Sequence, residues 1–334
     1  LHSHPMLSPA DIHAAADRLR AGGVVAFPTE TVYGLGADAF DEAAVRRVFE
    51  LKGRPVNNPL IVHVSGPEMA KRVAREWSDV RGAEALARAF WPGPLSILVP
   101  RSLALPEIVT AGSNLVAVRC PNHPVALALL FELGSPMVGP SANLSGEVSP
   151  TTAAHVRASF AEQLVPVLDG GACEAGIEST VVDVTSDPPR VLRPGMVSAE
   201  QIAAVLGCEV DELNATAFGG PLHSPGLLDR HYAPRTPAHL FDAGDWPRIR
   251  RLFPSAVVLR HREQAGDGGF RTIEMPSDAA EYAGRLYAAL READALAAPV
   301  ILIERPPIDT PLWRAIADRL RRATTALTES GRAT

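Results

Sequence analysis

Apolar residues recur at helical spacing or in short β-branched runs throughout the first two hundred residues, with Pro and Gly between them. Ser8 and Pro9 precede apolar positions three and four apart and predict a helix that ends at Gly22. The same spacing after Asp41 predicts a helix that ends at Gly53. Further helices are predicted over residues 124–133, 150–164 and 199–206, and strands over 24–27, 60–64, 95–99, 116–119, 136–138 and 180–184.

The remaining chain has a different pattern. Residues 208–237 are rich in Pro and Gly and predict a linker, although His231 and Tyr232 are side chains that an inert spacer does not require. Short strands then alternate with helices, which predicts a small doubly wound parallel sheet. The predicted division is a domain over residues 8–207, a linker or lid over 208–237 and a second domain over 238–330.

Composition narrows the functional classes. The 334 residues carry a formal net charge of −6, which disfavours a dedicated nucleic-acid binder. Arg314, Arg319, Arg321 and Arg322 in the last predicted helix are therefore interpreted as a solvated helix face. The three cysteines form no CxxC pair and favour a reducing cytoplasm, and no apolar run reaches membrane-spanning length.

Lys52 is one of only two lysines and lies beside Gly53 and Arg54 at a predicted helix end. A compact ammonium with rotatable donors suits a phosphate oxygen, and we expect the side chains of Lys52 and Arg54 to be exposed to a ligand. A solvated lysine favoured by the helix dipole is the alternative.

Small polar side chains gather in residues 139–151. Ser141 and Asn143 alternate after a predicted strand and can face one ligand. Thr151 lies at the start of the predicted helix, where free amides can bind an anion, although a simple helix cap explains the preceding serine equally well. Arg54, Arg119 and Arg193 lie beside or just before proline and could supply a positive field, whereas His63 alone is best interpreted as a core histidine.

The sequence contains no Walker P-loop, GxGxxG, GxSxG or HExxH motif and no convincing Cys/His pairing. Positioning and charge stabilisation are therefore expected to matter more than a covalent nucleophile.

The chain resembles the Sua5/YrdC/YwlC family of threonylcarbamoyl-AMP synthases in its two-domain Sua5 form. The resemblance covers nearly the whole first domain, and the linker segment 224–237 resembles the one that distinguishes Sua5. The matching stretches are FPTETVYGLG (27–36), KGRPVNNPLIVHV (52–64), FWPGPLSILV (90–99), VAVRCPNHP (116–124), GPSANLSGEVSPT (139–151), LDGGACEAGIESTVVDV (168–184) and VLRPG (191–195).

This resemblance implies a YrdC-like α/β fold, with a twisted mixed sheet and flanking helices, plus a smaller Rossmann-like doubly wound C-terminal domain. It also implies an enzyme that joins L-threonine, bicarbonate and ATP into threonylcarbamoyl-AMP and releases pyrophosphate, the first step of N6-threonylcarbamoyl modification of adenosine 37 in tRNA. Mg²⁺ is expected with ATP, held mainly by phosphates and water, with no protein metal ligand.

By motif position, the resemblance implies two sets of binding residues, with Lys52 and Arg54 also taken as catalytic. The nucleotide set is Lys52, Arg54, Asn58, Asn143, Thr151, Arg193 and Tyr232, the last as part of a lid. The threonine set is Thr31, His63, Arg119, Ser141 and Ser179. Asn58 is preferred to Asn57 because it directly precedes proline.

Two other functions stay open. An RNA-binding module acting in translation is the alternative, and a carbamoyl-transfer role like that of hydrogenase-maturation proteins is disfavoured because their zinc fingers are not visible here. The expected partners also include the transferase machinery that uses the product, and a weak contact with tRNA is possible. No membrane association is expected.

Overall fold

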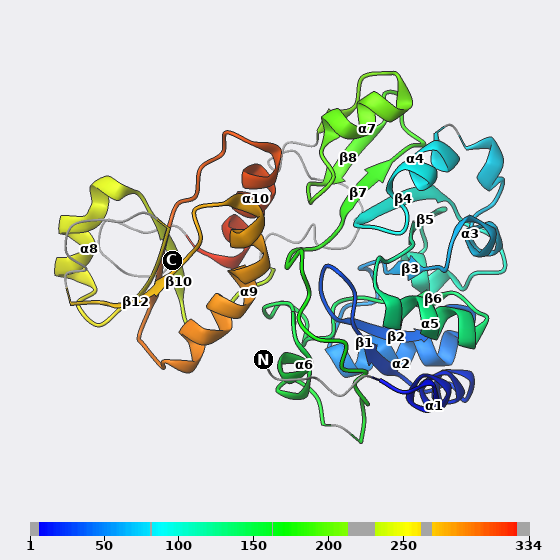
Figure 1. The fold of residues 1–334 in the computed structure, drawn as a ribbon, viewed down its shortest axis with the longest axis horizontal. Coiled ribbons are helices and arrows are strands. Elements are labelled where there is room, and N and C mark those ends of the chain that lie inside the picture. The colour runs from blue at the N-terminus through cyan, green and yellow to red at the C-terminus, as the bar shows by residue number, and fades with distance from the viewer. Residues whose placement is uncertain (1–6, 81, 162, 213–230, 262–268, 326–334) are drawn as a thin grey trace. The chain divides into compact units, whose positions relative to one another are not determined.

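The structure is a computed structural model that describes residues 7–80, 82–161, 163–212, 231–261 and 269–325. The chain divides into two compact units, residues 1–145 with 150–227 and residues 146–149 with 228–334 (Figure 1). Most of the predicted linker, residues 213–230, lies outside the described residues, and the three predicted domain ranges stay predictions. The placement of residues 146–149 in the second unit was not indicated by the sequence.

The first unit is built on a nine-stranded mixed sheet, in the order β1-β2-β6-β3-β5-β4-β7-β8-β9. Its strands are β1 (Val25–Phe27), β2 (Gly34–Asp38), β3 (Ile61–His63), β4 (Leu95–Pro100), β5 (Leu115–Arg119), β6 (Met137–Val138), β7 (Thr180–Asp183), β8 (Arg190–Arg193) and β9 (Asp211–Glu212). The pairs β3 with β5, β4 with β7 and β8 with β9 are parallel, and the other pairs are antiparallel. The predicted twisted mixed sheet is confirmed.

Helices of this unit begin and end at local signals. They are α1 (Pro9–Arg20), α2 (Glu42–Lys52), α3 (Pro67–Val73), α4 (Ala83–Phe90), α5 (Pro124–Leu133), α6 (Ala153–Arg157) and α7 (Ala199–Leu206), with short 3₁₀ turns η1 (Trp77–Asp79) and η2 (Glu107–Thr110). Ser8 forms a capping box with Asp11, and Ser198 forms one with Gln201. Gly53 ends α2 in the left-handed conformation, with φ 58°.

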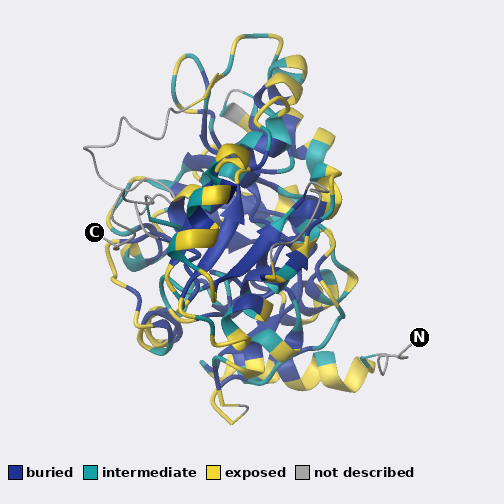
Figure 2. Cartoon of the chain, turned by 90° about the vertical axis from the view of Figure 1, so that its left-hand side faces the viewer, coloured by how far each residue is buried: buried dark blue, intermediate teal, exposed yellow. Residues whose placement is uncertain are grey.

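The two faces of the sheet have different surroundings. Side chains alternate along each strand, so Val62, Val118 and Ile97 face the main helical core. On the opposite face, β1 packs against α1 and α5, whereas Ile61 and Ala117 belong to a small separate apolar cluster completed by Leu98, Val181 and Leu192. Most strand residues of the chain are buried (dark blue in Figure 2), although both residues of β9 are exposed.

Strand β2 was not predicted, because its sequence is GLGAD. Its glycines have a packing reason, since a Cβ added at Gly34 would lie 2.7 Å from Cζ of Phe27. Helices α3 and α4 and strand β8 were also not predicted.

The helix predicted over residues 150–164 is much shorter than expected. Thr152 caps α6, which ends at Arg157. The chain then becomes extended and pairs with β1, because Ala26 N–H donates to the Pro166 carbonyl and Leu168 N–H to the Ala26 carbonyl, both at 2.9 Å. Tertiary pairing with β1 thus overrides the local helical pattern.

The second unit has a four-stranded parallel sheet, in the order β10-β13-β11-β12. Its elements are β10 (Ala238–Phe241), η3 (Ala243–Asp245), α8 (Trp246–Leu252), β11 (Val257–Arg260), β12 (Arg271–Glu274), α9 (Ala279–Ala295), β13 (Ile301–Glu304) and α10 (Pro311–Ala323). Helix α8 covers one face of this sheet, and α9 and α10 cover the other (Figure 1). The predicted doubly wound domain is confirmed.

The interpretation of the last helix as a solvated face was wrong for two of its arginines. Arg319 is fully buried and Arg322 nearly so. Both contact Asp318 at 3.1 Å, and the pKa of that carboxyl lies below its usual value despite its burial, because the two guanidiniums stabilise its charged form. Among the described residues, no helix is long and apolar enough to cross a bilayer.

Candidate active site

A row of polar side chains crosses the sheet of the first unit. His63 is the register partner of Arg119 in the parallel pair of β3 and β5, so both side chains point to one face. In the antiparallel pair of β4 and β5, Ile97 is opposite Val118. The next residues along the two strands, Ser96 and Arg119, are therefore neighbours on the other face of the sheet. Val181 is opposite both Ser96 and Arg193, which extends the row to β8. This row lies on the face that carries the small apolar cluster.

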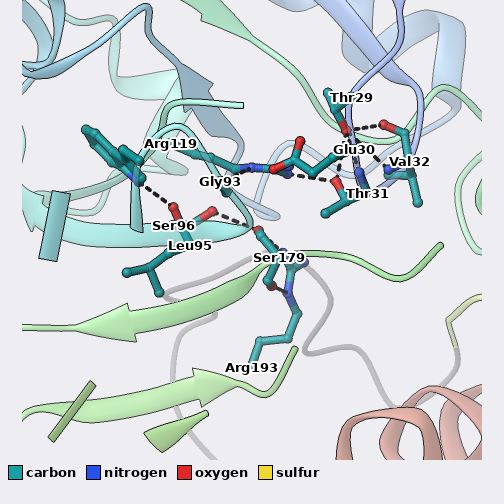
Figure 3. A network of polar contacts seen from close by, with 11 residues as sticks. Thr29, Glu30, Thr31, Val32, Gly93, Leu95, Ser96, Arg119, Ser179 and Arg193 are labelled. Carbon is teal, nitrogen blue, oxygen red and sulfur yellow. Dashed lines mark hydrogen bonds and ion pairs between the residues drawn. The ribbon is translucent and has the colours of Figure 1, made fainter. Parts of the chain in front are cut away.

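Arg119 is the centre of a buried polar network (Figure 3). Its Nε–H donates to the Gly93 carbonyl at 3.3 Å and its Nη1–H to Oγ1 of Thr31 at 2.9 Å. Its Nη2 lies 2.6 Å from Oε2 of Glu30. With 3 % of its surface exposed, Arg119 is a desolvated cation whose orientation is fixed from three directions.

A second set of contacts lies at the next strands of the same network. The hydroxyls of Ser96 and Ser179 are 2.9 Å apart. Arg193 donates through Nη2 to the Ser179 hydroxyl and through Nε to the Ser179 carbonyl, both at 3.0 Å (Figure 3). Arg193, assigned to the nucleotide by resemblance, therefore contacts a residue assigned to threonine.

His63 is buried, with its ring edge-on to Phe27 at 5.4 Å between centroids. Burial, and secondarily the charge of Arg119, lowers its pKa well below the usual 6.5, so the imidazole is neutral near pH 7. Its Nδ1 has no hydrogen-bond partner among the residues that the structure describes. A buried imidazole with an unused nitrogen is a candidate ligand-binding group, which goes beyond the core role first considered.

Lys52 and Arg54 are both buried, and their expected contact with a ligand stays a prediction. Lys52 is 2 % exposed, and its Nζ donates to the carbonyls of Ser141 at 2.5 Å and Asn143 at 2.6 Å. Arg54 donates to the carbonyls of Asn58 at 3.2 Å and of the following proline at 2.9 Å. Backbone carbonyls hold both cations, those of a distant loop for Lys52 and those of its own loop for Arg54.

The amide of Asn58 is buried, and neither its nitrogen nor its oxygen has a partner among the described residues. Asn57 beside it is exposed. Ser141 pairs through the backbone with Gly34, and Asn143 donates to the Leu144 carbonyl at 2.7 Å. These residues form a second group, held by Lys52 and Arg54.

The two remaining predicted residues, Thr151 and Tyr232, have contacts of their own. Thr151 is buried, with its amide and hydroxyl each 3.3 Å from Nδ1 of His155. Helix α6 begins at Ala153, two residues after Thr151, and nucleotide binding by Thr151 stays a prediction. Tyr232 belongs to the second unit, where it stacks on Tyr287 at 5.7 Å and lies under the Arg319 guanidinium at 5.6 Å. Its φ of 62° is unusual for a residue with a side chain.

Comparison with known proteins decides the family. The Sua5/YciO/YrdC family model, described as "Telomere recombination", matches residues 17–195. A second model, described as "Threonylcarbamoyl-AMP synthase, C-terminal domain", matches residues 197–325. The chain belongs to the Sua5/YrdC family.

Relatives of the family match more than nine-tenths of the chain. The threonylcarbamoyl-AMP synthase of Pyrococcus abyssi is 40 % identical over 93 % of each chain, and that of Bacillus subtilis is 40 % identical over 93 % of this chain and 92 % of its own. The crystal structure of P. abyssi Sua5 complexed with L-threonine has a TM-score of 0.87 at 37 % identity, covering 96 % of both chains. A variant of that protein, with a histidine and a tyrosine replaced by alanine, has a TM-score of 0.88 at 36 % identity, over 96 % of this chain and 95 % of its own.

Sequence reasoning missed two polar residues of this Sua5/YrdC site. Glu30 lies within the quoted FPTETVYGLG stretch but was not singled out, although an acid between two threonines is an unusual composition for a buried loop. Ser96 lies inside an apolar strand, where a lone hydroxyl gives no local signal. Among the described residues, no group of three His, Cys, Asp or Glu side chains is placed to hold a metal ion.

Proposed function

We propose that this Sua5/YrdC protein is a threonylcarbamoyl-AMP synthase that joins L-threonine, bicarbonate and ATP and releases pyrophosphate. The observation that carries the proposal is the match, over nine-tenths of the chain, to relatives named as this enzyme, one of which has been crystallised with L-threonine. These matches favour the synthase over the RNA-binding alternative.

The arginine-centred network fits the threonine side of the reaction. Arg119 is a buried, oriented guanidinium, which suits the substrate carboxylate. Neutral His63 offers Nδ1 to the substrate hydroxyl, and the Ser179 hydroxyl lies at the other end of the same row. Because a carbamate is short-lived in water, the burial of these groups serves to exclude water while the intermediate is aligned.

The second group fits the nucleotide side. Lys52 fixes the loop that presents the Ser141 hydroxyl and the Asn143 amide, and Arg54 fixes the loop that presents the buried amide of Asn58. In this proposal, the main role of Lys52 and Arg54 is to hold these loops in the conformation that binds the nucleotide. The carbamate oxygen then attacks the α-phosphate in line, so relative positioning of the two groups is the main catalytic requirement.

Other parts of the proposal rest on the resemblance. Mg²⁺ would enter with ATP, held by phosphate oxygens and water, since the described side chains offer no preformed group of metal ligands. The proposal also includes nucleotide contacts of Thr151 and Tyr232 and a cytoplasmic location. It further includes delivery of the product to a tRNA-modifying transferase and a weak contact with tRNA.

The test is pyrophosphate release from ATP with bicarbonate, with and without L-threonine, together with mass spectrometry of the product. Threonine-dependent release with a threonylcarbamoyl adenylate is the expected result. No release from folded protein that binds ATP would refute the proposal, and filter binding of tRNA would then test the alternative.

A further inference from the structure

The buried carboxylate of Glu30 has unused capacity for hydrogen bonds. Only 8 % of the residue is exposed, and Oε2 lies 2.6 Å from Arg119. This contact is an ion pair in which the N–H direction misses the oxygen, so neither carboxylate oxygen has an aligned donor among the described residues. A buried carboxylate can accept several hydrogen bonds, and leaving it without any is costly. Such a group in a polar network calls for a ligand.

The ligand that fits is a cation. Glu30 borders a cavity of about 460 Å³ in the first unit, whose charged lining side chains include Asp169 and Glu174 but no lysine or arginine. His123 also borders the cavity, and burial lowers its pKa below 6.5, which leaves it neutral near pH 7. This acidic lining favours an ammonium group beside Glu30 and disfavours a phosphate, and Arg119 is not among the residues that line the cavity.

Arg119, on the other side of the ion pair, has capacity for an anion. The guanidinium has five N–H donors, and its contacts with Gly93 and Thr31 use one each. Nη2 has no aligned acceptor among the described residues. Adjacent buried opposite charges, each with unused hydrogen-bonding capacity, match the adjacent ammonium and carboxylate of a free α-amino acid (Figure 3).

We infer that Glu30 receives the α-amino group of the amino-acid substrate while Arg119 receives its carboxylate. This inference rests on the proposed function and adds to it a residue that selects an amino acid over the corresponding acid without the amine. An amine or a carboxylate alone would engage only half of the pair.

The test compares two ligands by titration calorimetry. L-threonine is the first, and (R)-3-hydroxybutyrate, which keeps the carboxylate and hydroxyl but lacks the amine, is the second. Glu30→Gln is expected to weaken threonine binding about 10- to 100-fold, since a hydrogen bond to a charged group is lost. Binding of (R)-3-hydroxybutyrate is expected to weaken less than about threefold. Glu68→Gln, an exposed carboxylate of helix α3 that pairs with Lys71 and does not line this cavity, is the matched control and should leave both affinities near wild type.

Equal losses for both ligands would show that Glu30 only positions Arg119, and would overturn the inference. Unchanged threonine binding in Glu30→Gln would overturn it too. If that variant fails to fold, Glu30→Asp keeps the charge and draws it back by one methylene, and the same selective loss for threonine is expected. Wild-type protein that does not bind threonine would refute the proposed function and this inference with it, whereas the other outcomes leave the proposed function standing.

Discussion

Replacement of Lys52 by methionine is expected to damage both stability and activity. Its ammonium donates two short hydrogen bonds to the carbonyls of Ser141 and Asn143, and only 2 % of the residue is exposed. Each charge-assisted bond contributes about 1.5–3 kcal/mol, and removing the ammonium also removes its desolvation cost. The expected net loss is about 2–4 kcal/mol in the free energy of unfolding, or roughly 4–16 °C in melting temperature for a domain of about 200 residues.

The assay combines thermal unfolding, hydrogen exchange and turnover. Exchange should accelerate in peptides that contain Ser145, whose N–H donates to the Lys52 carbonyl at 2.8 Å. Turnover should fall about 100-fold in kcat/KM, because a loop displaced by about 1 Å misplaces the reacting groups. Lys71→Met is the matched control, since that lysine is exposed and pairs with Glu68 on one helix, a contact that contributes at most about 0.5 kcal/mol. A Lys52→Met melting temperature within about 2 °C of wild type, with unchanged exchange, would refute the reasoning.

Three further substitutions test the threonine side. Gly139→Ala places a Cβ 2.6 Å from His63 Nδ1 and 2.9 Å from a Phe27 ring carbon. The overpacking should lower the free energy of unfolding, measured in urea, by about 1–3 kcal/mol. An unchanged free energy of unfolding would contradict this packing. The pKa of His63 is lowered in the folded state, so the unfolded chain binds more protons below pH 6.5 and stability is lost as pH falls through that range. His63→Gln should therefore flatten the pH dependence of unfolding between pH 6.5 and 5 by up to about 1.4 kcal/mol per pH unit, and an unchanged slope would count against burial of a neutral ring. Arg119→Lys removes a planar fork that contacts a carbonyl, a hydroxyl and a carboxylate at once, so calorimetry should show about 10- to 100-fold weaker threonine binding, which wild-type affinity would disprove.

Elements with local signals were predicted well from the sequence. The bounds of α5 and α7 match their predictions because Pro124 begins the first, Ser198 caps the second, and a left-handed glycine follows each. Strand β2 was missed because its glycines make sense only against the ring of Phe27. Local sequence patterns therefore predict where helices end, but they do not show that a glycine in a strand is needed for packing against a distant ring.

The site shows the same division. Lys52 and Arg119 were singled out from the sequence as candidate binding cations, but the burial of Lys52 depends on carbonyls of a distant loop that sequence spacing does not place. Glu30 was missed because its meaning comes from Arg119, which register and not sequence brings to it. Residue type predicted which groups could act, and the register of the sheet decides what each one contacts.

Two different supports hold the two proposed halves of the site. Strand register fixes His63 and Arg119 against each other, whereas the loop with Ser141 is held by the Lys52 ammonium and by backbone pairing with Gly34. Arg193 lies at the end of β8 and contacts Ser179, although its resemblance assigns it to the nucleotide. A carbamate oxygen must meet the α-phosphate where the two halves join, and a cation there can stabilise charge on both reactants. Under the proposed function, the contact with Ser179 suits Arg193 to couple threonine alignment to phosphate alignment.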